Sequence, residues 1–132
     1  MTDLVIDSTK VKAVEAIEQF TGPTDEAIVP GVYCRLNTTT GKITKGNASS
    51  AAEARKLGVC ISNLAGRVTV LRKGIVFLDD ALDALTYDDD VFLSNTDGTL
   101  ADAAGTVSLI VGTVVPLYGY LPNAKKGLRL DL

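Results

Sequence analysis

Short runs of β-branched and aromatic residues, separated by turn-forming residues, constrain the fold of this chain most strongly. Gly, Asn, Asp and Ser fill the gaps between the runs, which is the composition of strands joined by tight turns. The candidate strands are residues 32–36, 42–44, 57–62, 67–72, 74–78, 91–94, 106–115 and 127–131. The sequence therefore predicts an all-β fold, a compact small barrel or sandwich with at most one or two short helical turns.

One helical turn is expected after residue 50. Ser50 and Glu53 have the spacing of a capping box, in which each side chain satisfies a free backbone donor of the other residue. A short helical turn over residues 51–56 follows from this spacing.

Residues 9–20 fit two kinds of structure. Ala13, Ile17 and Phe20 are spaced for one face of a helix, but apolar and polar residues also alternate here as they do in an edge strand. We favour the strand.

A weak internal repeat suggests that the domain consists of two similar halves. Three segments recur in the same order: residues 32–43 match 91–100, residues 57–61 match 111–115, and residues 67–70 match 127–130. A unit present only twice favours two halves folded around one core over an open solenoid. Chance matches within an all-β chain remain the alternative.

The chain has no histidine, and this absence restricts its chemistry more than any other fact of composition. Ser-His-Asp and Cys-His nucleophile systems and imidazole metal ligands are excluded. The 132 residues form a single domain by length, and 13 basic against 16 acidic residues give a net charge of −3. Because no basic cluster is interleaved with aromatic residues, we expect no nucleic-acid partner.

The two cysteines and the apolar segments point to a soluble protein made in the cytosol. Cys34 and Cys60 are too few for a Cys-only zinc site and too far apart for a CxxC motif, and both fall in predicted strands as buried, reduced thiols. The first residues carry acids where a signal peptide needs positive charge. Residues 107–121 are too short and too interrupted to span a bilayer, so no membrane partner is expected.

Acidic residues are concentrated between residues 79 and 90. These are Asp79, Asp80, Asp83, Asp88, Asp89 and Asp90. Converging carboxylates would bind a metal ion or a carbohydrate, and a carboxylate-based enzyme is possible in principle. The competing interpretation is structural: apolar residues within 81–87 are spaced for a short helical turn, and the acids flank it as a cap and a solvated loop.

Asp97-Gly98 lies between two candidate strands. Asn95-Thr96-Asp97-Gly98 looks like the start of a calcium loop, but the glutamate that an EF-hand needs at its last position is missing. Asp-Gly is a strong hairpin signal because Gly adopts positive φ without strain. We therefore predict a hairpin turn.

Taken in order, several short segments resemble the small decoration (cement) proteins of tailed-bacteriophage heads. The segments are residues 20–22, 29–33, 40–43, 57–59, 70 with 74–76, 91–98, 111–112 and 128–132. The resemblance covers residues 14–132, and its specificity lies in the order of the segments, since each alone is a common hairpin or glycine.

This resemblance implies a non-enzymatic virion protein without cofactor or small-molecule substrate. Such a protein is made in the host cytoplasm, forms a homotrimer and binds the major capsid protein on the outer surface of the head. Residues 1–13 lie outside the family pattern and are expected to be an N-terminal arm ahead of a single β domain over 14–132. Main-chain pairing of this arm with a capsid edge would use the residues Asp3, Leu4, Val5, Ile6, Asp7 and Lys10. A frayed terminus and a first strand docked on its own sheet are the alternatives.

Overall fold

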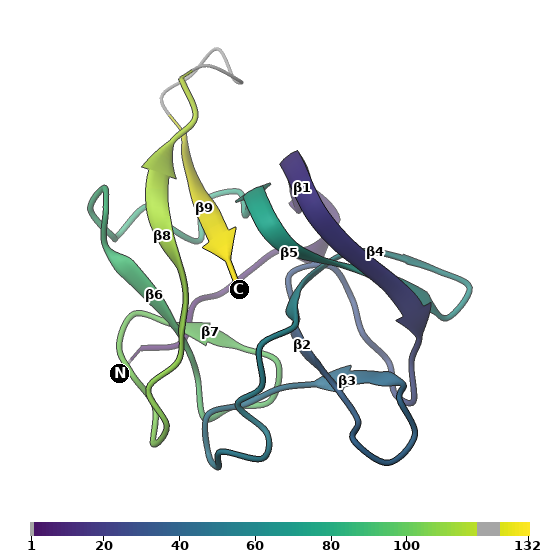
Figure 1. Ribbon diagram of the computed structural model, residues 1–132. Coiled ribbons are helices and arrows are strands. Elements are labelled where there is room, and N and C mark those ends of the chain that lie inside the picture. Colours follow the sequence, from purple (N-terminus) through teal and green to yellow (C-terminus); the bar gives the residue numbers. More distant parts are fainter. Residues whose placement is uncertain (1, 119–124) are drawn as a thin grey trace.

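The computed structural model describes residues 2–118 and 125–132, which form a curled antiparallel sheet (Figure 1). This confirms the all-β prediction. The strands of the described part are β1 (Lys12–Pro23), β2 (Tyr33–Leu36), β3 (Ile43–Lys45), β4 (Gly58–Leu64), β5 (Arg67–Phe77), β6 (Asp90–Leu93), β7 (Leu100–Ala101), β8 (Ile110–Pro116) and β9 (Lys126–Asp131). A 3-10 turn, η1 (Ser8–Lys10), precedes β1. Among the described residues, no helix has the length and apolarity needed to cross a membrane.

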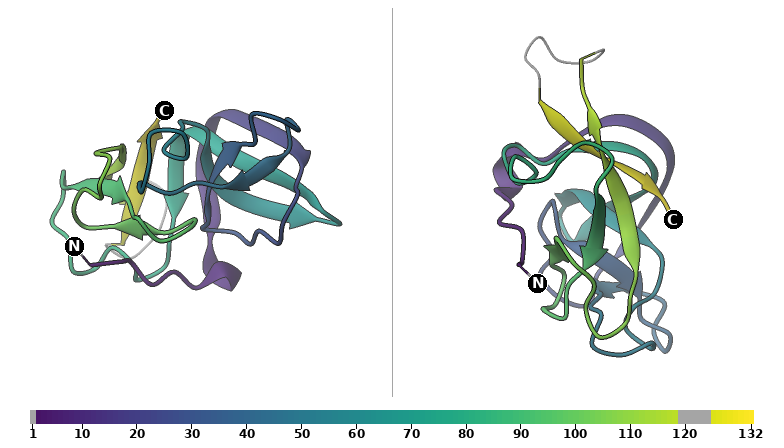
Figure 2. Two further views of the ribbon diagram at one scale, coloured as in Figure 1. Left: turned by 90° about the horizontal axis from the view of Figure 1, so that it is seen from below. Right: turned by 90° about the vertical axis from the view of Figure 1, so that its left-hand side faces the viewer.

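The order of the strands is mirrored about the middle of the sheet. The order is β3-β2-β4-β5-β9-β8-β6-β7, so the four strands of residues 33–77 and the four of residues 90–131 follow the same path outward from the central pair β5 and β9. Figures 1 and 2 show the two groups side by side. The predicted repeat therefore corresponds to two halves with equivalent strands.

Two glycines occupy equivalent places in these halves. A Cβ atom on Gly58 would lie 2.3 Å from the carbonyl oxygen of Leu71, and a Cβ on Gly112 would lie 2.3 Å from that of Arg129. Each glycine thus lets its strand approach the neighbouring backbone closely, β4 against β5 and β8 against β9. The match of residues 57–61 with 111–115 is correct. The match of 67–70 with 127–130 is displaced by two residues, because these contacts make Leu71 of the first half equivalent to Arg129 of the second.

Buried side chains form two clusters. The smaller lies within the first half and contains Ile28, Cys34, Ile43, Leu57, Cys60, Val68 and Val70. The larger joins both halves and contains, among others, Tyr33, Val59, Leu71, Leu93, Leu100, Leu128 and Leu130. The halves therefore share a core and cannot separate without exposing it to water.

Strand β1 pairs with β5 and confirms the strand interpretation for residues 12–20, whereas residues 9 and 10 belong to the 3-10 turn η1. Gly74, at φ 140°, makes the pairing possible, because a Cβ there would lie 2.0 Å from the carbonyl oxygen of Glu15. The prediction of two strands at 67–72 and 74–78 was wrong for this reason. Gly74 interrupts the sequence pattern but not β5, where it lets the backbone of the paired strand β1 come close.

Three other boundaries differ from the sequence prediction. Residues 51–53 form a hydrogen-bonded turn, residues 54–56 have no regular structure, and no helix forms here. The Glu53 carboxylate accepts a bond from the hydroxyl of Ser49. Strand β8 begins at Ile110, because residues 102–109 form a loop in which the Val107 N–H donates to the carbonyl of Ala48. The expected boundary between residues 13 and 14 lies inside β1.

Candidate functional site

The predicted capsid-binding residues lie in one N-terminal segment, residues 2–10, which runs beside β7. Asp3 forms an antiparallel bridge with Ala101, and the Leu4 N–H donates to the carbonyl of Leu100 at 2.8 Å. Thr2 accepts a bond from the N–H of Asp102 and donates its own N–H to the Asp102 carboxylate at 2.7 Å. The segment thus extends the sheet beyond β7.

The carboxylate of Asp3 anchors this segment to the turn that follows β6. It accepts hydrogen bonds from the hydroxyls of Ser94 at 2.5 Å and Thr96 at 3.0 Å. The Ser94 hydroxyl, which is fully buried, also accepts a bond from the N–H of Thr96. Because a buried hydroxyl without a partner is costly, this three-residue network favours the docked position of the segment.

Side chains of the segment alternate between the domain and the solvent. Leu4 and Ile6 pack against the larger core cluster, and Ile6 fills the space beside Gly31, where a Cβ would lie 2.7 Å from its methyl group. Val5 points away from the domain and is 86% exposed. The alternation is that of a strand with one buried face.

The outer edge of the segment is available for main-chain pairing. The backbone of Thr2 and Leu4 bonds to the β7 side, and alternate residues of an antiparallel strand point their N–H and C=O groups to opposite edges. Asp3 and Val5 therefore direct these groups outward, where no described residue accepts or donates a backbone bond to them.

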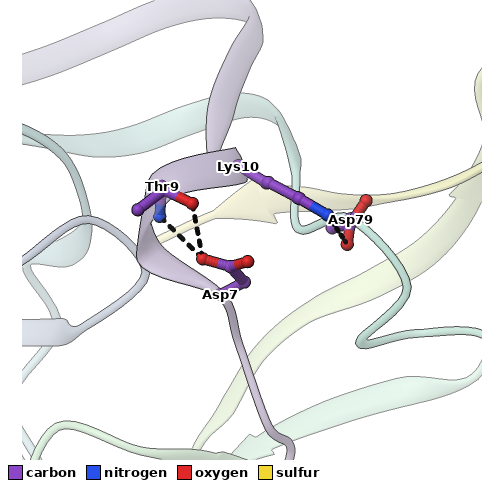
Figure 3. A network of polar contacts seen from close by, with 4 residues as sticks. All are labelled: Asp7, Thr9, Lys10 and Asp79. Carbon is purple, nitrogen blue, oxygen red and sulfur yellow. Dashed lines mark hydrogen bonds and ion pairs between the residues drawn. The ribbon is translucent and has the colours of Figure 1, made fainter.

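The end of the segment is fixed by a small polar network (Figure 3). Asp7 caps η1, accepting bonds from the hydroxyl of Thr9 at 2.7 Å and from its N–H at 3.0 Å. The hydroxyl bond, followed by the backbone bond, holds the pKa of the Asp7 carboxyl below its ordinary value. Lys10 forms an ion pair with Asp79 at 3.7 Å, which ties the segment to the loop after β5. As a partly exposed pair, it contributes little to stability by itself.

Of the three possibilities for the N-terminus, the described structure has the one in which it docks on its own sheet. The predicted residues remain together, but Leu4 and Ile6 pack against the core and the carboxylate of Asp3 is held by two hydroxyl groups. Among the predicted residues, Val5 is the apolar one whose side chain lies in the solvent. Ser94 and Thr96 were not predicted as part of the site. Their contact with Asp3 joins residues more than ninety positions apart, and no local sequence pattern predicts it.

The acidic residues 79–90 form turns between β5 and β6. Asp79 pairs with Lys10, and Asp89 accepts a bond from the N–H of Thr86, which lowers the pKa of the Asp89 carboxyl. Within residues 2–118 and 125–132, no three His, Cys, Asp or Glu side chains lie close enough to share a metal ion. Of the apolar residues in this segment, Leu82 is fully buried and Leu85 packs against the larger core cluster, as the structural interpretation expects.

Both thiols are buried and unpaired. Burial raises the pKa of Cys34, and burial also raises the pKa of Cys60 to about 11. Such thiols are protonated and unreactive near neutral pH.

The Asp97-Gly98 hairpin turn is confirmed between β6 and β7. Gly98 has φ 67°, and its backbone bonds to the first half of the domain, donating to Gly46 at 2.7 Å and accepting from Tyr33 at 2.9 Å. The Asp97 carboxylate accepts a bond from the side chain of Asn47. The turn therefore joins the two halves.

Comparison with protein-family models, with curated proteins and with solved structures finds no match to this chain.

Proposed function

We propose that this protein is a non-enzymatic structural subunit of a bacteriophage virion, which binds the outer surface of the assembled head as a homotrimer and stabilises it. The major capsid protein is its partner. The N-terminal segment meets the shell, with Val5 as the central contact and the outward main-chain groups of Asp3 and Val5 pairing with a capsid strand.

The observation that carries this proposal is the free edge beside β7. An exposed edge with unpaired N–H and C=O groups is a template for strand addition, and proteins normally cover or charge such an edge. Here the edge carries an apolar residue, Val5, that is 86% exposed. The order of the sequence segments that resemble phage decoration proteins is the reason for choosing the major capsid protein as the partner.

Co-sedimentation with empty heads of the phage whose genome carries this gene tests the proposal. Wild-type protein should pellet with the heads, and Val5→Asp should weaken binding at least about tenfold, because a carboxylate would be desolvated at the contact. Leu64→Asp is the matched control, since Leu64 is 75% exposed at the end of β4, in the other half of the domain.

Two results would contradict the proposal. Wild-type protein that stays in the supernatant would remove the head as a partner. Loss of binding in Leu64→Asp but not in Val5→Asp would move the contact away from the N-terminal segment. Stabilisation of the fold by added metal ions or sugars, lost on substitution of Asp80 and Asp83, would instead favour a binding module.

A further inference from the structure

Charge is distributed very unevenly along this chain. Residues 27–78 contain eight Lys and Arg residues and a single acidic residue, Glu53. Residues 79–105 contain eight Asp residues and no Lys or Arg. The small net charge of −3 therefore conceals two strongly charged blocks of opposite sign.

Two basic residues of the first block, Arg55 and Lys56, line a groove between the β2–β3 turn and the segment before β4, called here the basic groove. Its volume is about 590 Å³, and it is lined by Leu36, Asn37, Thr38, Gly41, Arg55, Lys56 and Leu57. Arg55 and Lys56 are exposed, and the ion pairs of the described residues use neither. Leu36, at 36% exposure, adds apolar surface.

The second block forms the loop between β5 and β6, called here the acidic loop (residues 79–90). The carboxylates of Asp80, Asp83, Asp88 and Asp90 are exposed and make no ion pair with a described residue. Tyr87 stands among them at 43% exposure. Aromatic side chains of this kind are frequent anchors of protein interfaces.

The acidic loop is held in a fixed conformation, and this lowers the entropic cost of binding. The ammonium group of Lys126 donates to the backbone carbonyls of Asp83 and Leu85 and lies 5.2 Å from the centre of the Tyr87 ring. Lys10 pairs with Asp79. These two cations face the loop, but Lys126 bonds to the backbone and Lys10 to a single carboxylate, so the exposed carboxylates keep their charge.

The two charged surfaces lie at opposite ends of the molecule. In Figure 1 the connection from β5 to β6 is at the upper left and the β2–β3 turn at the lower right, and the view from below in Figure 2 keeps them at opposite ends. A single chain therefore cannot bring its own acidic loop to its own basic groove.

We propose that the occupant of the basic groove is the acidic loop of a second copy of this chain. Tyr87 lies against Leu36, and the carboxylates around it pair with Arg55 and Lys56. Contacts between two different surfaces of the same chain are head-to-tail and close into a ring when the rotation fits. This inference rests on the proposed homotrimer and names the surfaces that form it.

Sedimentation velocity at fixed protein concentration tests this contact. The groove variant is Arg55→Glu with Lys56→Glu, and the loop variant is Asp80→Lys with Asp83→Lys. Each should raise the concentration needed for assembly at least about tenfold, because like charges then face each other. The four substitutions combined in one chain should restore assembly, since the charges are exchanged. Lys12→Glu with Arg67→Glu is the matched control, because both residues are exposed but lie outside the groove.

The outcomes separate this inference from the proposed function. Wild-type assembly should weaken as salt is raised. A groove variant that assembles like the wild type, or a combined variant that assembles no better than either parent, overturns the contact, and so does a wild type that stays monomeric. If the groove variant still forms trimers but no longer pellets with heads, the groove binds the capsid and not a second copy of this chain. If a variant loses its circular dichroism spectrum, Arg55→Gln with Lys56→Gln replaces it and should still weaken assembly.

Discussion

Replacing Gly58 or Gly112 by Ala tests the equivalence of the two halves. At each position the new Cβ would lie 2.3 Å from a backbone carbonyl oxygen, about 1 Å closer than an ordinary carbon–oxygen contact. The obstacle is backbone, so a side-chain rotation cannot relieve the clash. The strands must separate locally, and one or two interstrand hydrogen bonds, each worth about 0.5–1.5 kcal/mol, are weakened. Together with overpacking strain, we expect each variant to lose roughly 2–3 kcal/mol of unfolding free energy.

Urea denaturation at one fixed protein concentration measures this loss, because the stability of an assembling chain depends on its concentration. Gly41→Ala and Gly66→Ala are controls: both glycines have positive φ, but a Cβ at either would meet no atom within 4 Å. Backbone strain alone should cost these controls about 1 kcal/mol. The two halves are not equivalent if Gly58→Ala or Gly112→Ala is no less stable than the controls, or if only one of the two variants loses stability.

Three further predictions follow from the packing and the titrating groups. Ile6→Ala should lower the unfolding free energy, measured in urea, by about 1–2 kcal/mol, whereas Val5→Ala, at the exposed neighbouring position, should change it by less than about 0.5 kcal/mol. Equal effects of the two substitutions would mean that the segment is not docked. Gly98→Val should cost at least about 1 kcal/mol because φ is 67°, and an unchanged melting temperature would contradict the turn. Burial raises the pKa of Cys60 from its ordinary value near 9 to about 11, and it also raises the pKa of Cys34. As pH rises, the thiols of the unfolded chain therefore ionise at a lower pH than those of the folded chain. The unfolding free energy should therefore fall as pH rises above about 9, and replacing both thiols by Ala should reduce that fall.

The framework of the fold could be predicted because its signals are local. Alternation and turn residues identify strands such as β2 and β9, and the Asp97-Gly98 pair identifies a turn from two neighbouring residues. The repeat was visible because Gly58 and Gly112 are each required by a close backbone approach, which no other residue permits.

What the sequence could not supply depends on contacts between distant segments. In the sequence, Gly74 looks like a break in a strand. Its presence is explained by the close approach of the paired strand β1, which is visible only in the structure. The docking of the N-terminal segment depends on Ser94 and Thr96, which reach Asp3 only in the folded chain. The basic groove likewise combines two loops that meet only in the folded chain. The uneven distribution of charge, in contrast, is visible in the sequence and indicates two surfaces of opposite charge.

Cryo-electron microscopy of empty heads mixed with this protein tests the proposed function most directly. The heads would come from the phage whose genome carries the gene, and heads without added protein would be the control. We expect additional three-lobed density on the outer surface, at or near local three-fold positions, with the N-terminal segment between the lobe and the capsid. Maps that show no added density, or added density whose nearest element to the shell is the β2–β3 turn, would contradict it.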